Sequence, residues 1–245
     1  MPDPERIWII GASDGIGAAL ARRWAGAGAR LILSARSEDA LRALAAALGP
    51  EHQVLRVDVA DRASLDAAAR VIASRGPLDR IIHMAALYDP GSVAALDPES
   101  AMRIVAVNLM GSFHVAQVAP PLLREGGQLA FCGSVAGYFG LPQGQIYSAT
   151  KAGVMNLAQS LRAELSGRID VRLISPGFVD TRLTRRNDFR MPAMVTPEVA
   201  ARAIVTGLDR RMFEIHFPRR LTSFVKLLSI LPYWASLPLT ARLVR

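Results

Sequence analysis

The stretch that decides the fold is Arg6-Ile-Trp-Ile-Ile10 followed by Gly11-Ala-Ser-Asp-Gly15-Ile-Gly17. The first five residues form a short apolar run typical of a buried strand, and the glycines lead directly into a helical pattern from Ile16 to Gly26. Gly11 permits a sharp turn, Gly15 lets the backbone approach a pyrophosphate, and Gly17 allows the helix to pack closely on the strand. The positive end of that helix attracts an anion. The segment therefore predicts a dinucleotide-binding unit, although a tight turn without a ligand could carry the same glycines.

The same alternation of strand and helix continues along the chain. Short β-branched runs predict strands at Arg6–Ile10, Arg30–Ser34, Gln53–Val57, Arg80–Met84, Gly127–Cys132, Asp170–Ile174 and Phe213–His216. Ala/Leu/Arg-rich stretches between them predict helices, including Glu38–Leu48, with Ser37 as its N-cap and Gly49-Pro50 as its end. Alternating βαβ units imply a parallel sheet. We expect an α/β fold: a single-domain, doubly wound Rossmann-type parallel sheet of about seven strands with helices on both faces.

Composition narrows the class of protein. A chain of 245 residues, half of them apolar, has the size of one domain with a continuous core. Its one cysteine, Cys132, excludes an internal disulfide and a cysteine-based metal site, and it fits a reducing cytosol. Cys132 could be a buried strand residue or a nucleophile. We expect no signal peptide. The net charge of +8 is compatible with nucleic acid, an anionic membrane surface or a phosphorylated ligand.

Ser134, Tyr147 and Lys151 form the strongest chemical signal. Tyr147 and Lys151 stand at positions i and i+4 of a predicted helix, Gln145–Ser166, so both project from one face. Ser134 follows a predicted strand, at the edge where doubly wound sheets bind ligands. Reducing a ketone requires an acid at the oxygen, and a free phenol has a pKa near ~10. The ammonium of Lys151 should lower the pKa of Tyr147, which would make Tyr147 the proton donor and, in reverse, the acceptor.

The spacing Gly-x-x-x-Gly-x-Gly, together with Ser134 and Tyr147-Ser-Ala-Thr-Lys151, resembles the short-chain dehydrogenase/reductase family. The resemblance extends from about Arg6 to Gly177 and more loosely to Leu208. It implies an oxidoreductase that transfers hydride between a nicotinamide cofactor and a carbonyl/alcohol substrate. It also implies that Ser134 positions the substrate oxygen and that Lys151 contacts the nicotinamide ribose. In the oxidised complex, the positive nicotinamide ring should help Lys151 to lower the pKa of Tyr147.

Further positions take their roles from the same resemblance. Asn108 matches the asparagine that holds a water behind the lysine, and Asp58-Val59 resembles the adenine contact, although Asp58 could instead cap a helix starting near Arg62. Val179 and Thr181 match residues that hold the nicotinamide carboxamide, and Thr181 could also be an N-cap. No metal ligand is predicted. The predicted cofactor-binding residues are Gly11, Ser13, Gly15, Ile16, Gly17, Arg36, Asp58, Val59, Ala85, Tyr147, Lys151, Pro176, Gly177, Val179 and Thr181.

The end of the second predicted strand favours NADP(H) over NAD(H). Ala35 stands where NAD-dependent relatives carry Asp, and Arg36 offers a fork of donors to a 2′-phosphate. Ser13 could add a hydroxyl. Against this, Asp14 occupies a position where many NADPH-using relatives carry Lys or Arg, and Arg36 could simply be a solvated residue at a helix start.

One segment departs from the family. His83-Met84-Ala85-Ala86 replaces the usual Asn-Asn-Ala-Gly, which keeps a small residue at Ala85 but loses two amides and a glycine. His83 could be a satisfied structural histidine or a catalytic one. The departure leaves a second hypothesis, a non-catalytic NADP(H)-binding regulator or scaffold, against which the retained Ser134, Tyr147 and Lys151 argue. A nucleic-acid binder would rest on charge alone, so no nucleic-acid partner is expected.

Two segments lie outside the predicted strand and helix pattern. Residues 180–196 predict a mobile substrate flap or an ordinary surface loop, before a helix from Pro197 to about Leu208. We expect residues 1–217 to form the dehydrogenase domain and residues 218–245 to form a basic amphipathic extension of it. Its predicted apolar stripe is at 221, 224, 225, 228 and 231, with Arg219, Arg220 and Lys226 near the polar side.

Pro232, Pro238 and Lys226 argue against a spanning helix in that extension. It could make peripheral membrane contact through residues 219–245, which would suit an apolar or lipid-like substrate, or it could seal a substrate pocket or a subunit interface. The single cysteine leads us to expect a cytoplasmic location. The resemblance implies a homodimer or homotetramer in which the helices around Asn108 and Tyr147 pair between subunits.

Overall fold

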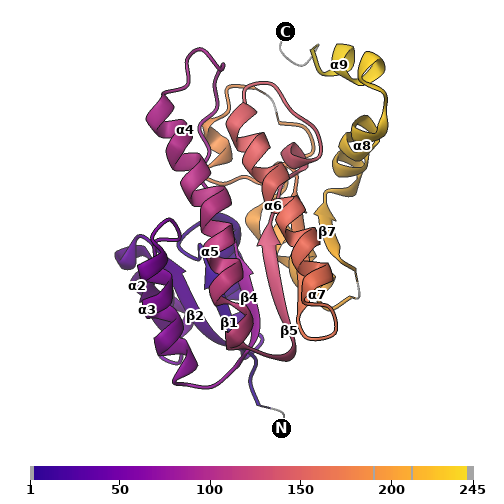
Figure 1. Ribbon diagram of the computed structural model, residues 1–245. Coiled ribbons are helices and arrows are strands. Elements are labelled where there is room, and N and C mark those ends of the chain that lie inside the picture. Colours follow the sequence, from indigo (N-terminus) through magenta and orange to yellow (C-terminus); the bar gives the residue numbers. More distant parts are fainter. Residues whose placement is uncertain (1–2, 190, 211, 242–245) are drawn as a thin grey trace.

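Seven parallel strands form one sheet in the order β3-β2-β1-β4-β5-β6-β7. The computed structural model describes residues 3–189, 191–210 and 212–241 (Figure 1). The strands are β1 (Arg6–Ile10), β2 (Arg30–Ala35), β3 (Gln53–Arg56), β4 (Leu78–His83), β5 (Leu123–Cys132), β6 (Asp170–Pro176) and β7 (Glu214–Phe217). The winding direction reverses between β1 and β4, where a ligand crevice is expected at the carboxyl ends. The predicted doubly wound Rossmann-type sheet is confirmed.

Helices cover both faces of the sheet because successive strand side chains point to opposite sides. Trp8 and Ile10 of β1 belong to one core, and Ile7 and Ile9 to the other. On the first face lie α3 (Arg62–Ala73), α5 (Gly111–Val118) and α6 (Gln145–Glu164), and on the second lie α1 (Gly15–Ala25), α2 (Glu38–Leu48) and α7 (Pro197–Leu208). Helix α4 (Pro98–Val105) leads through a π-helical turn, Ala106–Met110, into α5.

Some ends of the elements differ from the predictions. Strand β5 begins at Leu123 instead of Gly127, because Leu123 pairs with Leu78 of β4 before a register shift. Ser37 precedes α2 as expected, yet its side chain makes no capping hydrogen bond within the described part of the chain. Asp61, not Asp58, caps α3, where its carboxylate accepts a bond from the Ala63 amide at 2.9 Å. Local hydrogen bonds of this kind are not fixed by the apolar pattern.

The C-terminal extension forms two helices, α8 (Arg219–Ile230) and α9 (Tyr233–Ala241), beside β7 and beyond the carboxyl end of the sheet (Figure 1). The predicted single apolar stripe of α8 divides. Val225 and Leu228 are buried, whereas Phe224 is exposed. In the described ranges, no helix has both the length and the apolar character required to cross a bilayer.

Candidate active site

A pocket of about 510 Å³ lies at the carboxyl edge of the sheet, where β1 and β4 diverge. It collects segments from the ends of β1, β2, β3, β4, β5 and β6 and from the N-terminal part of α6. All the predicted cofactor and catalytic residues line it except Asn108. They are Gly11, Ser13, Gly15, Ile16, Gly17, Arg36, Asp58, Val59, Ala85, Ser134, Tyr147, Lys151, Pro176, Gly177, Val179 and Thr181.

The glycine loop leaves no room for side chains. A Cβ on Gly11, whose φ is +93°, would lie 2.5 Å from the Ala85 amide nitrogen, and a Cβ on Gly17 would lie 2.1 Å from the Gly11 carbonyl oxygen. A Cβ on Gly15 would meet Thr181 Cγ2 at 2.9 Å. Three backbone segments therefore meet at the start of α1, whose N-terminal N–H groups suit an anion. This cradle fits the pyrophosphate of a dinucleotide.

The three predicted catalytic residues converge at the end of β5. Ser134 is 9% exposed and its Oγ accepts a hydrogen bond from the Ala136 amide at 3.1 Å. Lys151 is 2% exposed, and its Nζ donates to the Cys132 carbonyl oxygen at 2.8 Å. The same Nζ lies 5.6 Å from the centroid of the Tyr147 ring. An ammonium, a phenol and a hydroxyl thus share one largely dry corner of the pocket.

The protein by itself does not acidify this phenol. Burial raises the pKa of Tyr147, Cys132 adds to the rise, and the Ser134 hydroxyl offsets only part of it. The predicted lowering, which includes the positive nicotinamide ring of the oxidised complex, is not found in the chain without cofactor, where desolvation is the largest influence on the pKa of Tyr147. Burial also lowers the pKa of Lys151 and raises the pKa of the Cys132 thiol. Cys132 is a half-buried residue at the end of β5 that lines the pocket, and its protonated thiol argues against a role as a nucleophile.

Asn108 lies behind the pocket, in the π-helical turn between α4 and α5. Its Oδ1 accepts from the Leu87 amide at 2.7 Å, and its Nδ2 donates to the Leu87 carbonyl at 2.9 Å and to Thr150 Oγ1 at 3.1 Å. Asn108 therefore joins the segment after β4 to the turn of α6 that carries Lys151. Single π-helical turns of this kind often occur at functional sites.

His83 ends β4 and is buried, at 2% exposure, beside Phe131. Neither ring nitrogen has a hydrogen-bond partner among the described residues. Burial, with a smaller effect of Lys151, lowers the pKa of His83 to about 3. The residue is therefore a neutral core side chain, and the expectation of a hydrogen-bonded structural histidine is wrong because neither nitrogen is satisfied.

The opposite end of the pocket is basic. Arg36 and Ser37 line it after β2, and Arg56 Nε donates to the Arg36 carbonyl oxygen at 3.2 Å, which brings a second guanidinium to this edge. Asp58 lines the pocket and accepts from the Ala60 amide at 3.0 Å. Asp58 thus stays available as a ligand contact and does not cap α3.

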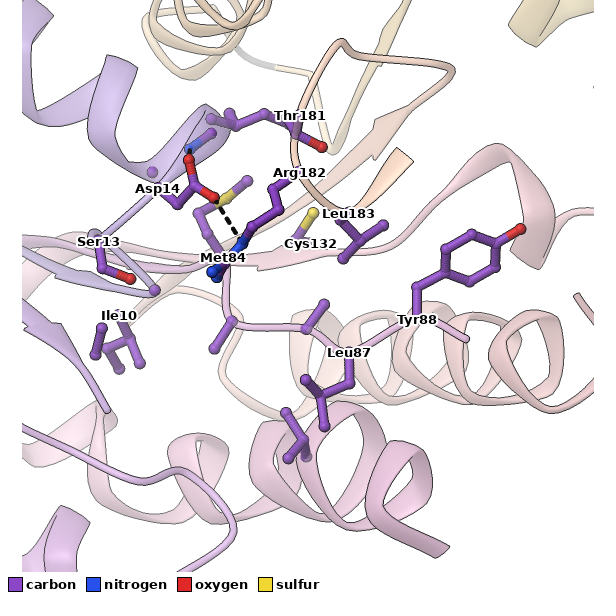
Figure 2. Close-up of a pocket in the computed structure, with 18 of the residues that line it drawn as sticks. Ile10, Ser13, Asp14, Met84, Leu87, Tyr88, Cys132, Thr181, Arg182 and Leu183 are labelled. Atoms are coloured by element: carbon purple, nitrogen blue, oxygen red, sulfur yellow. Dashed lines mark hydrogen bonds and ion pairs between the residues drawn. The ribbon is translucent and has the colours of Figure 1, made fainter. Parts of the chain in front are cut away.

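Several pocket residues escaped the sequence analysis. Arg182 reaches across the pocket so that its Nε lies 3.2 Å from Asp14 Oδ2 (Figure 2). Tyr88 packs edge-on against Tyr147, with ring centroids 4.8 Å apart, and donates to Asn187 Oδ1 at 2.7 Å. Leu87, Tyr88 and Leu183 lie at the end opposite Ser13 (Figure 2). An apolar and aromatic run after β4 was the available signal for Leu87 and Tyr88, whereas nothing in the sequence pairs Arg182 with Asp14.

Segment 180–196 is tied to the body at several points. Val179 bridges to Val195, and the Asp180 amide donates to the Val195 carbonyl at 2.9 Å. Arg186 donates to the Tyr88 carbonyl at 2.8 Å and pairs with Asp89 at 2.7 Å. Thr181 faces the glycine loop, and its Oγ1 also accepts a hydrogen bond at 3.4 Å from the amide of Thr184, the first residue of the short turn Thr184–Arg186. The described residues include no cluster of three or more His, Cys, Asp or Glu suited to a metal ion.

Comparisons with known proteins agree with this geometry. Residues 5–190 match the short chain dehydrogenase family. The chain is 30% identical over 206 residues to the 3-oxoacyl-[acyl-carrier-protein] reductase MabA of Mycobacterium tuberculosis, covering 83% of this chain and 81% of that protein. A short-chain dehydrogenase from Sphingobium yanoikuyae in complex with NADPH has a TM-score of 0.79 and 28% identity over 93% of this chain and 96% of its own. One from Burkholderia phymatum in complex with NAD is similar in fold, with a TM-score of 0.84, 24% identity and 92% coverage of each chain.

Proposed function

Because the chain belongs to the short-chain dehydrogenase family and is an oxidoreductase of that type, we propose that it transfers hydride between NADP(H) and a carbonyl/alcohol substrate. The observation that carries the proposal is the convergence of Ser134, Tyr147 and Lys151 at one end of a pocket whose other end is lined by Arg36. An extended dinucleotide spans such a pocket, with its phosphates at the glycine loop. Cofactor binding alone would not require an acid beside a serine and a lysine.

The residues divide the chemistry between them. The nicotinamide, when bound, supplies or accepts the hydride. Tyr147 Oη gives its proton to the substrate oxygen while Ser134 Oγ donates a hydrogen bond to the same oxygen. Loss of this proton leaves a phenolate, and burial disfavours that charge by raising the pKa of Tyr147. The ammonium of Lys151 and the positive ring of the oxidised cofactor would stabilise the phenolate. Asn108 acts as a positioning residue, since it holds Thr150 beside Lys151.

Tyr147→Phe tests this function directly. The variant keeps the ring but loses the proton, so we expect turnover on a carbonyl panel, followed by NADPH absorbance, to fall about 10²- to 10⁴-fold. Binding of NADPH, measured by titration, should be retained. Wild-type turnover in Tyr147→Phe, or an absence of turnover by the wild type on every carbonyl together with intact NADPH binding, would contradict the proposal.

We further propose that NADP(H) is preferred over NAD(H). Ala35 brings no carboxylate to repel a 2′-phosphate, Arg36 lines that end of the pocket, and Arg56 contacts the Arg36 carbonyl oxygen beside it. A charge-assisted hydrogen bond contributes about 1.5–3 kcal/mol, so Arg36→Ala should weaken NADPH binding roughly 10- to 100-fold. NADH binding should change little, because NADH has no 2′-phosphate. An equal loss for both cofactors, measured by titration, would show that Arg36 does not select between them.

The proposed substrate is an apolar, lipid-like carbonyl or alcohol. Leu87, Tyr88 and Leu183 surround the catalytic end of the pocket, and Tyr88 stacks edge-on against Tyr147. Segment 180–196 would act as the flap over this end, since Arg186 and Asn187 already connect it to Tyr88. A cytoplasmic location is proposed on the free thiol of Cys132.

A further inference from the structure

The C-terminal extension exposes a run of large apolar side chains. We define the C-terminal face as Phe224, Leu227, Ile230, Tyr233 and Trp234. The most exposed are Ile230, Tyr233 and Trp234, at 76%, 75% and 81%, where α8 ends and α9 begins. Monomeric proteins rarely expose a large apolar patch to water, and such patches commonly mark interaction sites. We therefore expect this face to contact an apolar partner.

The extension holds this face in a fixed orientation. Thr222, Val225 and Leu228 of α8 are buried against the body. Lys226 pairs with Glu214 of β7, and its Nζ lies 5.1 Å from the centroid of the Tyr138 ring. With its inner side anchored, α8 cannot rotate to bury Phe224, Leu227 and Ile230. Helix α9 buries Ser236 and Thr240, while a cavity of about 770 Å³ separates part of it from segment 136–142.

Charge distinguishes between possible partners. No Asp or Glu follows Glu214 in the sequence, whereas Arg219 and Arg220 begin α8 and are exposed. The same face of a second copy would offer these arginines no acidic partner from its own extension, because none follows Glu214. An anionic surface would instead be attracted to them, by about 1 kcal/mol for each basic residue near a bilayer.

We propose that the C-terminal face docks on the surface of an anionic lipid bilayer. Tyr233 and Trp234 lie at the level of the headgroups, where amphipathic aromatic rings are favoured. Phe224, Leu227 and Ile230 enter the boundary of the acyl chains, and Arg219 and Arg220 contact lipid phosphates. The contact is peripheral, since α8 and α9 lie on the membrane and do not span it. It is independent of the proposed hydride transfer.

Tryptophan fluorescence offers a specific readout of this contact. The chain has three tryptophans; Trp8 and Trp24 are 0% and 3% exposed, so only Trp234 can enter a lipid phase without unfolding. The full-length protein is titrated with vesicles of phosphatidylglycerol and phosphatidylcholine, and separately with phosphatidylcholine alone. Emission should shift to shorter wavelength with the anionic vesicles, and the protein should co-sediment with them.

Matched variants distinguish this contact from nonspecific adsorption of the protein to vesicles. Ile230→Asp places a charge in the face, whereas Val93→Asp places one at a similarly exposed residue elsewhere, at 70%. Ile230→Asp should abolish co-sedimentation and Val93→Asp should not. Removing Arg219 and Arg220 by substitution to Gln should weaken binding about fivefold for each arginine. Circular dichroism and NADPH binding verify that each variant is folded.

Three results would overturn the proposal. The wild type could fail to bind either kind of vesicle, or Ile230→Asp and Val93→Asp could bind equally well. Alternatively, sedimentation velocity could show that Ile230→Asp, in the absence of lipid, lowers the mass of the wild-type assembly. That last result would assign the C-terminal face to a subunit interface.

Discussion

At the scale of single residues, His83 fits its surroundings least well. Its two ring nitrogens are buried without partners among the described residues, in the sheet position next to Ile10 of β1. Leaving a buried polar group unsatisfied costs about 1–3 kcal/mol. The cost is tolerated because the imidazole is neutral and packs on Phe131.

We expect this histidine to make stability depend on pH. Its folded pKa of about 3 lies below the unfolded value near 6.5, so the unfolded chain binds a proton that the folded chain does not. Stability therefore falls as pH decreases from 6.5 toward 3, by about 2 kcal/mol at pH 5. His83→Leu, of similar volume, should be more stable at pH 7.5 and should lose that part of the pH dependence.

Urea unfolding at pH 7.5 and pH 5 measures the difference for both proteins. Parallel losses in wild type and His83→Leu would mean that other groups cause the acid sensitivity. A variant less stable than the wild type at pH 7.5 would show that the imidazole has partners which the structure does not reveal.

At the scale of elements, the β1–α1 unit depends on backbone contact between neighbouring turns. Gly17 belongs to the first turn of α1 and lies against the Gly11 carbonyl. Added volume at such a contact typically costs about 1–3 kcal/mol. Because the same turn forms the phosphate cradle, stability and cofactor binding should be affected together.

Gly17→Ala should lower the free energy of unfolding by about 1–3 kcal/mol and weaken NADPH binding by tenfold or more, at roughly 1.4 kcal/mol for each factor of ten. Gly140→Ala is the matched control, since a Cβ there meets no atom within 4 Å. Thermal unfolding and NADPH titration check both. If the two variants behave alike, the close approach at Gly17 does not limit the loop.

The strands, the helices and most of the pocket residues could be predicted from the sequence, because they follow from short-range patterns. Apolar runs located all seven strands, and Gly11 to Gly17 indicated the edge of the sheet where the other site residues meet. Hydrogen-bond partners could not be predicted in the same way. The Arg182–Asp14 pair and the partners of Asn108 depend on groups that only the fold brings together. The cap by Asp61 is local, but the apolar pattern does not distinguish it from a cap by Asp58. The raised pKa of Tyr147 in the chain without cofactor could not be predicted, because burial cannot be read from sequence spacing.

At the scale of the whole molecule, two of the exposed apolar regions among the described residues lie on different helices. One is the C-terminal face, and the other lies on α4 and α5 and in the turn between them, where Met102, Met110 and Phe113 are exposed. The second region carries fewer Lys and Arg residues than the C-terminal extension. We therefore propose that it pairs the subunits of a homodimer or homotetramer, as the family resemblance implies.

Phe113→Glu should dissociate that assembly, because a charge would be buried at the interface without a partner. Sedimentation velocity should show a lower mass than for the wild type. Val199→Glu on α7 is a suitable control, since Val199 and Phe113 are each 43% exposed. Unchanged mass in Phe113→Glu, or a wild type that is already monomeric, would contradict this arrangement.

Because the seven strands are parallel, the molecule has a carboxyl pole, where all the strands end, and an amino pole, where they begin. The two poles carry different functional groups. The glycine loop, Ser134 and segment 180–196 gather at the carboxyl pole, and α9 extends beyond that same pole (Figure 1). The amino pole, where Glu5 pairs with Arg80, carries none of these groups. A fluorescent protein fused ahead of Asp3 would lie at the amino end, away from the pocket. The same fusion on α9 would lie beside the C-terminal face and hinder its contact with lipid.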